Sequence, residues 1–199
     1  MIGRFVIVVV VAAMLTGCAT SSHAPLQISR SVAVLPANNL TGDPLLVMGA
    51  GLIDRYVRRT GEVSVGDVLQ SEARFQLQQK GFEVGELKAQ EGSQGRAPAP
   101  TSLDAALAVA RQSGTKGSVL YLEIRRWEAD APIHTRFVIV SLTASLFDPA
   151  SGREIWHEHR PAAPVGTPGV ISVESAYVVA ARKVIAELLA PLRPEPPAK

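Results

Sequence analysis

The chain has 199 residues, with 20 lysine and arginine residues against 18 aspartate and glutamate residues, and a formal net charge of +2. This near-neutral balance argues against a nucleic-acid partner, because binding to phosphates requires a basic face. A chain of this length fits one domain and can bury about 70% of its unfolded surface. Its single cysteine, Cys18, excludes an internal disulfide.

The first 17 residues have the pattern of a secretory signal peptide. One basic residue, Arg4, precedes an unbroken apolar stretch over residues 5–15, and small residues follow. A helix that crosses a bilayer needs about 20 apolar residues, so this stretch is too short to span one. We therefore expect residues 1–17 to direct export.

The end of this segment, Leu15-Thr16-Gly17-Cys18, resembles the lipobox of bacterial lipoproteins. The resemblance implies a diacylglyceryl group on the Cys18 sulfur, cleavage before Cys18 and N-acylation of the new terminus. Two or more acyl chains anchor a protein stably, whereas a single chain gives marginal binding. By the same resemblance, Ala19 in place of an aspartate favours the outer membrane, on its periplasmic side, over retention in the inner membrane.

The mature chain divides into a tether, a body and a tail. Residues 19–27 are small, polar and proline-containing, so residues 18–30 are expected to form the lipidated cysteine and a flexible tether with a reach of about 30 Å. Residues 31–190 form one globular domain. Residues 191–199 hold four prolines and form a tail that cannot continue a helix.

The first half of the body alternates strands and helices. A buried strand over residues 31–36 is followed by a turn-rich loop, and an optional helix over 45–59 contains two glycines that disfavour it. A stronger helix covers 65–80 and ends at Gly81, followed by a strand at 82–84. Residues 85–100 form a long loop that is either disordered or a functional excursion.

The second half is richer in strands. Thr101 and Asp104 have the spacing of a capping box, which starts a helix that ends at Gly114. Strands follow over 119–127 and 137–147, and a turn at 148–152 leads into a strand over 154–159. After a Pro- and Gly-rich loop over 161–169, Ser172 caps a last helix that Pro191 stops.

The resulting order, β-α-β-α-β-β-β-α, predicts the α/β (α+β) class. Strict alternation over residues 137–147 is typical of an antiparallel sheet covered on one side. The expected body is a mixed β-sheet of about five strands with three to four helices mainly on one face.

Three segments resemble a superfamily that includes the TolB N-terminal domain, the curli-secretion lipoprotein CsgG and the penicillin-binding-protein activator LpoB. They are the strand and loop over residues 32–44, the strand over 117–122 and the hairpin over 142–156, although Ala37 stands where the family has an aromatic residue. The resemblance implies a fold and an envelope compartment. Its members are envelope lipoproteins or periplasmic binding modules and not enzymes, so no catalytic residue is assigned.

Two clusters are candidate sites. His157 and His159 lie on one face of a strand about 7 Å apart, and they could bind a metal if His134 or Glu123 supplied a third ligand. Without that ligand they form an exposed polar face, so no metal is assigned.

Arg125-Arg126-Trp127 could form a recognition patch at a strand end, or a solvated edge with a stacked tryptophan. Trp156 is expected in the core. No nucleophile elbow or phosphate-binding loop is present in the sequence.

These observations predict a lipid-anchored, periplasm-facing lipoprotein that acts as a non-catalytic binding, assembly or accessory factor for an envelope machine of transport, secretion or peptidoglycan synthesis. Its partners would be the membrane, through the anchor, and an envelope protein or further copies of the chain. We expect no cofactor apart from the diacylglycerol and N-acyl lipid at Cys18. The alternatives are a metal-binding protein or hydrolase that uses His157 and His159, and a structural, self-assembling lipoprotein.

Overall fold

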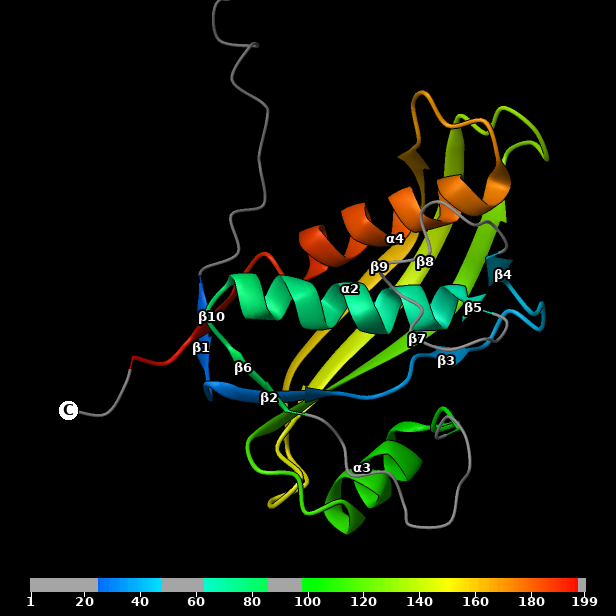
Figure 1. Ribbon diagram of the computed structural model, residues 1–199. Coiled ribbons are helices and arrows are strands. Elements are labelled where there is room, and N and C mark those ends of the chain that lie inside the picture. Colours follow the sequence, from blue (N-terminus) through cyan, green and yellow to red (C-terminus); the bar gives the residue numbers. More distant parts are fainter. Residues whose placement is uncertain (1–24, 48–62, 86–97, 197–199) are drawn as a thin grey trace, which may run out of the picture.

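The computed structural model describes residues 25–47, 63–85 and 98–196, so the signal segment and Cys18 lie outside the described residues (Figure 1). The helices of this part are α2 (Val65–Gln79), α3 (Leu103–Gln112) and α4 (Val173–Leu188). Its strands are β1 (Leu26–Ile28), β2 (Ser31–Val34), β3 (Asn38–Asn39), β4 (Leu46–Val47), β5 (Val63–Ser64), β6 (Glu83–Gly85), β7 (Ser118–Ala129), β8 (Phe137–Phe147), β9 (Glu154–Gly166) and β10 (Leu192–Pro194).

The main sheet has the order β6-β2-β7-β8-β9, and β3 pairs with β7 beyond the end of β2. The β6–β2 and β2–β7 pairs are parallel, whereas β7–β8 and β8–β9 are antiparallel. Figure 1 shows α2 and α4 side by side on one face of this sheet and α3 on the other side. The predicted class, the mixed sheet and the order of the main elements are therefore confirmed.

The two faces of the sheet bury two separate cores. On β7, Leu120 and Leu122 point into the larger core beneath α2 and α4, whereas Val119 and Tyr121 point into a smaller core beneath α3. Strand β8 has the predicted bounds, because its alternating apolar residues are all needed to fill the larger core.

Local side-chain bonds decide where the helices begin. Ser64 and Asp67 form a capping box at the start of α2, and Ser172 caps α4 as predicted. The cap of α3 is Ser102, whose hydroxyl accepts a hydrogen bond from the Ala105 N–H at 3.2 Å. The prediction that Thr101 begins a capping box was wrong by one residue.

The predicted tether and tail are each shortened by a pair of strands. Leu26 pairs with Leu192 in a parallel β1–β10 ladder, and the Leu26 N–H bonds to the Pro191 carbonyl at 2.9 Å. Ile28 and Leu192 are buried in the larger core, which makes this pairing favourable. The tether predicted over 18–30 is therefore wrong from Leu26 onward, and the tail predicted from residue 191 is wrong for residues 192–194.

Strand β9 extends to Gly166, so residues 161–166 of the segment predicted as a loop over 161–169 belong to the strand. Pro161 lies in a bulge opposite β8, between the pairs Leu142–Arg160 and Val140–Ala163. Prolines are tolerated at bulges and on edge strands, and β9 is an edge strand. The Arg160 guanidinium donates to the carbonyls of Val140 and Ala163 and so bridges the bulge.

Two further predictions fall largely outside the described residues. Of the optional helix over 45–59, residues 45–47 are described, and Leu46–Val47 form β4. Of the loop over 85–100, residues 86–97 are not described. No helix in the described ranges combines the length and apolarity needed to cross a bilayer.

Candidate functional site

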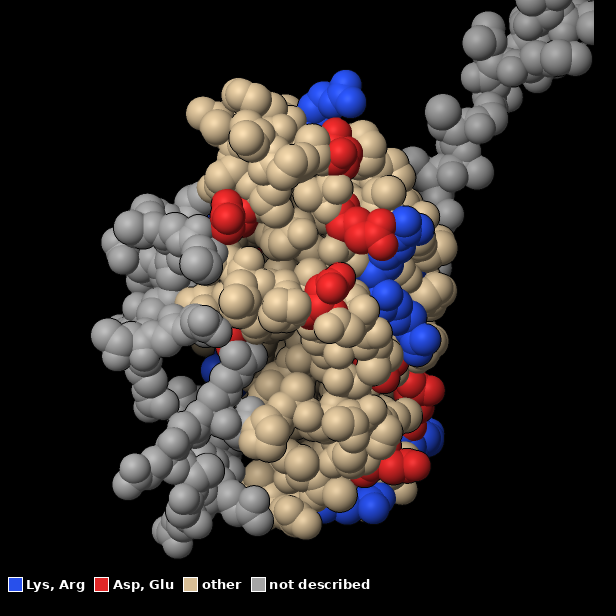
Figure 2. Space-filling model, turned by 90° about the vertical axis from the view of Figure 1, so that its right-hand side faces the viewer, with Lys and Arg blue, Asp and Glu red and all other residues tan. Residues whose placement is uncertain are grey.

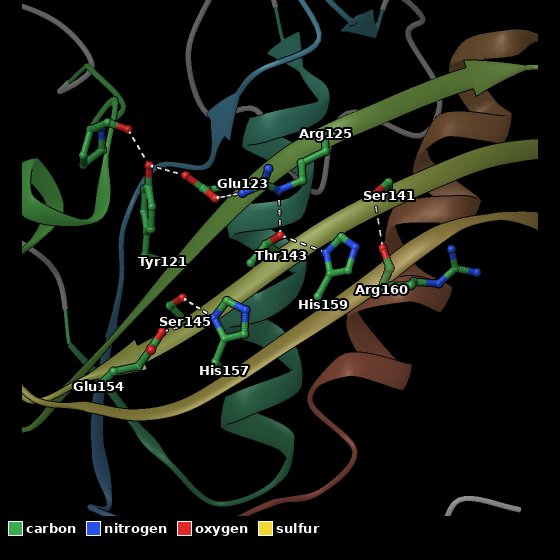
Figure 3. A network of polar contacts seen from close by, with 11 residues as sticks. Tyr121, Glu123, Arg125, Ser141, Thr143, Ser145, Glu154, His157, His159 and Arg160 are labelled. Carbon is green, nitrogen blue, oxygen red and sulfur yellow. Dashed lines mark hydrogen bonds and ion pairs between the residues drawn. The ribbon is translucent and has the colours of Figure 1, made fainter.

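The sheet face turned away from α2 and α4 carries a network of polar side chains from β7, β8 and β9 (Figure 3). Register places Glu123, Thr143 and His159 in one row across the three strands. The Arg125 guanidinium binds the Glu123 carboxylate at 2.9 Å and donates from Nε to the Thr143 hydroxyl at 2.9 Å. The same hydroxyl lies 3.2 Å from His159 Nδ1, so four side chains hold one another in place.

A second row contains Tyr121, Ser145 and His157. His157 Nδ1 lies 3.1 Å from the Ser145 hydroxyl and 3.1 Å from a Glu154 carboxylate oxygen. The Tyr121 hydroxyl donates to the Pro100 carbonyl at 2.9 Å, and burial raises the pKa of Tyr121 to about 12. This face is an ordered polar surface rather than a loose set of solvated side chains.

The structure does not assemble the ligand set of the metal hypothesis. Glu123 is paired with Arg125, and His134 lies in the β7–β8 hairpin loop. His159 pairs with Thr143, six residues along β8 from Phe137, or about 20 Å from the hairpin end. Within the described part of the chain, no three His, Cys, Asp or Glu side chains are placed to share a metal ion.

Of the predicted patch Arg125-Arg126-Trp127, only the two arginines lie at the surface, because Trp127 is buried in the core. A register shift between Ile124 and Arg126 places two successive arginines outward, so that Trp127 follows Ile124 into the larger core. Trp127 is 2% exposed, and its ring meets that of Tyr177 edge to face at 6.3 Å. Arg125 and Arg126 remain at the surface.

The exposed Arg126 binds Glu128 at 2.7 Å, and this hydrogen bond holds the pKa of Glu128 below its ordinary value.

Trp156, expected in the core, is half-buried and packs against the larger core.

Sequence reasoning missed two neighbouring loops that expose apolar residues, which we call the apolar tip: Pro132, Ile133, Pro168 and Ile171. The Ile133 and Ile171 side chains are 65% and 68% exposed. The His134 N–H donates to the Ile171 carbonyl at 2.9 Å, which joins the β7–β8 hairpin loop to the β9–α4 loop. The sequence signal that could have indicated this feature is an isoleucine inside each of two Pro-rich loops. A single sequence does not show that the two loops lie next to each other.

Comparison with known proteins bears on the fold. No protein-family profile matches the chain, and no curated protein is significantly similar to it. Among solved structures, the PelC dodecamer from Paraburkholderia phytofirmans is 20% identical with a TM-score of 0.52, over 87% of this chain and 96% of that chain. The lipoprotein GNA1162 from Neisseria meningitidis is 18% identical with a TM-score of 0.44, over 80% of this chain and 97% of that chain.

The LpoB C-terminal domain from Salmonella enterica is 16% identical with a TM-score of 0.31, over 71% of this chain and 86% of that chain. At these identities a likeness shows the fold alone. The chain shares the fold of PelC.

Proposed function

We propose that this chain is a lipid-anchored, periplasm-facing lipoprotein that acts as a non-catalytic binding or assembly factor in the bacterial envelope. The observation that carries the proposal is the position of Cys18, directly after a signal-like apolar segment and ahead of a body with the PelC fold. The same proposal places the anchor in the outer membrane, because Ala19 follows the cysteine.

The anchor would keep the body close to the membrane. Eight residue steps join Cys18 to Leu26, where β1 begins, and at about 3.6 Å a step they reach about 29 Å at most. Confinement to a layer of this depth raises the effective concentration of an envelope partner, so a weak interface is sufficient.

The polar sheet face supports a binding role. Its polar and charged groups are bound to one another, as in the Arg125–Glu123 and His157–Glu154 pairs. Thr143 and Ser145, which bond to these groups, are buried. A rigid surface of this kind can present hydrogen-bonding groups to a partner at a small entropic cost.

Self-assembly is a second candidate, favoured by one observation. PelC, which shares the fold over nearly its whole length, was solved as a dodecamer. We expect the mature chain to form a closed ring of identical subunits, since symmetric closure is the usual outcome for homo-oligomers. Light scattering on the purified chain from residue 19 onward, which lacks the apolar segment over 5–15, measures this directly, and a monomer at micromolar concentration would exclude it.

The anchor is tested by metabolic labelling with an alkyne analogue of palmitate, followed by the intact mass of the mature chain. The native chain should be labelled, and its mass should exceed that of the unmodified mature polypeptide by the mass of the attached lipid. The Cys18→Ser chain should show neither the label nor the added mass. Ala19→Ser is the matched control and should keep the label. If the sorting resemblance applies, the Ala19→Asp substitution should move the protein from the outer to the inner membrane, as measured by membrane fractionation. A native chain that carries no lipid would remove the basis of the proposal.

A further inference from the structure

Basic side chains from four separate segments lie at the end of the body where the tether joins it. The described chain begins at β1, which pairs with β10 just beyond the C-terminus of α4. Figure 1 shows β1, β10 and the C-terminal ends of α2 and α4 at the same end of the molecule. We call the set of basic side chains at this end the basic collar: Arg30, Lys80, Lys116 and Arg193.

Two of these cations converge on one oxygen atom. Lys80 Nζ and Arg193 Nη1 both donate to the Ala190 carbonyl, at 3.3 and 2.6 Å. Within the described ranges neither cation is paired with a carboxylate. Burial lowers the pKa of Lys80, and the positive charge of Arg193 lowers it further. Two like charges held this close, with only a carbonyl between them, favour a bound anion.

The other two basic residues extend this positive surface along the neighbouring segments. The Glu83 N–H donates to the Arg30 carbonyl at 2.9 Å, and the Ser31 hydroxyl donates to the Lys116 carbonyl at 3.1 Å. Lys116 is exposed, and the Arg30 guanidinium lies 3.6 Å from the Glu83 carboxylate. Glu195 is the other carboxylate on the described parts of these segments. Four basic side chains therefore stand against two acidic ones.

The side of the molecule opposite β1 and β10 has a different charge. Figure 2 looks onto that side and shows a mostly uncharged face with scattered acidic groups, while Lys and Arg side chains lie along one margin. Near the β7–β8 hairpin, Arg126 and Arg136 are each paired with a carboxylate, that of Glu128 and that of Asp130. The collar thus gives the tethered end a positive charge that the face in Figure 2 does not have.

An anchor at Cys18 would hold the collar close to the membrane. The chain between Cys18 and Leu26 reaches about 29 Å at most, whereas the 16 residues of α4 place its N-terminus about 24 Å further from this end. Anionic lipids attract lysine and arginine side chains near the bilayer surface, and each one favours binding about fivefold. The length of the tether and the charge of the collar therefore favour the same contact.

We infer that the basic collar docks on the headgroups of anionic phospholipids in the leaflet that holds the anchor. The inference rests on the proposed lipid anchor and adds the orientation of the body on the membrane. Lys80 and Arg193 bind a headgroup phosphate between them, and Arg30 and Lys116 lie against its neighbours. In this orientation the apolar tip, at the other end of α4, points away from the bilayer.

The test measures how close each end of the body lies to the headgroups. The mature, lipidated chain is placed in vesicles of phosphatidylcholine, with or without phosphatidylglycerol, that contain a lipid with a nitroxide on its headgroup. Because Cys18 is acylated, Gln79→Cys supplies the only free thiol for a fluorescent label, at an exposed position next to Lys80. Ile133→Cys labels the opposite end. Phosphatidylglycerol should increase nitroxide quenching at position 79 and not at position 133, and high salt should remove the increase.

Two pairs of substitutions locate the contact. Lys116→Gln with Arg193→Gln should lower the phosphatidylglycerol-dependent quenching at position 79 about fivefold or more, because two exposed collar charges are lost. Arg126→Gln with Arg136→Gln is the matched control, since it changes the net charge equally at other positions and should keep the quenching. Thermal unfolding checks that both variants remain folded.

Three results would overturn the inference. The first is quenching at position 79 that phosphatidylglycerol does not raise or that the collar variant leaves unchanged, and the second is an equal increase at positions 79 and 133. The third is loss of iodide access to the position-79 label in the chain from residue 19 onward as its concentration rises without vesicles, which would assign the collar to contact between copies.

A separate measurement distinguishes failure of the collar from failure of the proposed function. The chain from residue 19 onward has no anchor, and at low salt it should float with vesicles that contain phosphatidylglycerol and not with phosphatidylcholine vesicles. A native chain without lipid whose truncated form still floats contradicts the anchor alone. A lipidated chain without phosphatidylglycerol-dependent quenching contradicts the collar alone.

Discussion

Replacement of Gly117 by alanine should separate two central strands of the sheet. Gly117 immediately precedes β7, with φ at +85°, where β7 pairs in parallel with β2. A Cβ at this position would meet the Ser31 backbone oxygen, closer than any real Cβ contact, and Ser31 is tied to this loop by its hydroxyl bond to the Lys116 carbonyl. The contact is with backbone, so a rotamer change cannot relieve it.

The expected loss has two parts. A left-handed backbone conformation costs a residue with a Cβ about 1–2 kcal/mol. Displacement of β2 by the new methyl group adds about 1–3 kcal/mol, as for an overpacked core. We therefore expect Gly117→Ala to lower the free energy of unfolding by about 2–5 kcal/mol, and Tm by about 5–15 °C for a chain of this size.

Gly114→Ala is the matched control, because Gly114 also has a positive φ, at +62°, but its Cβ would meet nothing within 4 Å. It should lose only the backbone part, about 1–2 kcal/mol. Urea unfolding of the chain from residue 19 onward, followed by tryptophan fluorescence, compares the two variants. If Gly117→Ala is no less stable than Gly114→Ala, the close approach of β2 to the start of β7 is not a constraint and the reasoning is refuted.

Three further predictions concern other parts of the body. Leu192→Ala should lower the free energy of unfolding by about 2–5 kcal/mol because Leu192 is fully buried. Arg193→Ala should change it little because Arg193 is exposed. Equal effects of the two substitutions in urea unfolding would contradict the β1–β10 pairing. Burial in the folded state raises the pKa of Tyr121 to about 12, so the contribution of its neutral hydroxyl to stability is complete below pH 10 and is lost as pH rises from 10 to 12. The free energy of unfolding of Tyr121→Phe should therefore depend less on pH in that window. Identical pH profiles of the two chains would count against the buried hydroxyl. Arg126→Ala should leave the free energy of unfolding almost unchanged, since its ion pair with Glu128 is exposed and screened by water. A clear loss of stability in thermal unfolding would mean that this pair is structural.

The secondary structure was largely predictable because its signals are local. The bounds of β8 follow from alternation alone, and the start of α4 follows from Ser172 and the apolar stripe after it. The α3 cap shows the limit of this reasoning, since Thr101 and Ser102 are both good caps and the backbone conformation selects Ser102.

The candidate sites were less predictable because they depend on contacts between distant segments. Trp127 was expected at a surface edge, but the bulge at Arg125 reverses the alternation of β7 and turns the ring into the core. The two histidines lie on one strand as expected, yet the third ligand depends on a fold that leaves His134 at the other end of the sheet. The Cys18 assignment lies outside the described residues and stays a prediction.

Read alone, the order of residues predicted the main elements, their class and a lipobox-like motif at Cys18, because periodicity, caps and short motifs act within a few residues. Tertiary structure decided that Leu26 joins Leu192, that Trp127 is buried, and that the loop of Ile133 bonds to the loop of Ile171. Each of these contacts joins segments far apart in the chain or reverses the facing of a strand. Such contacts form only when burial of the whole core compensates for the entropy of closing the intervening loops.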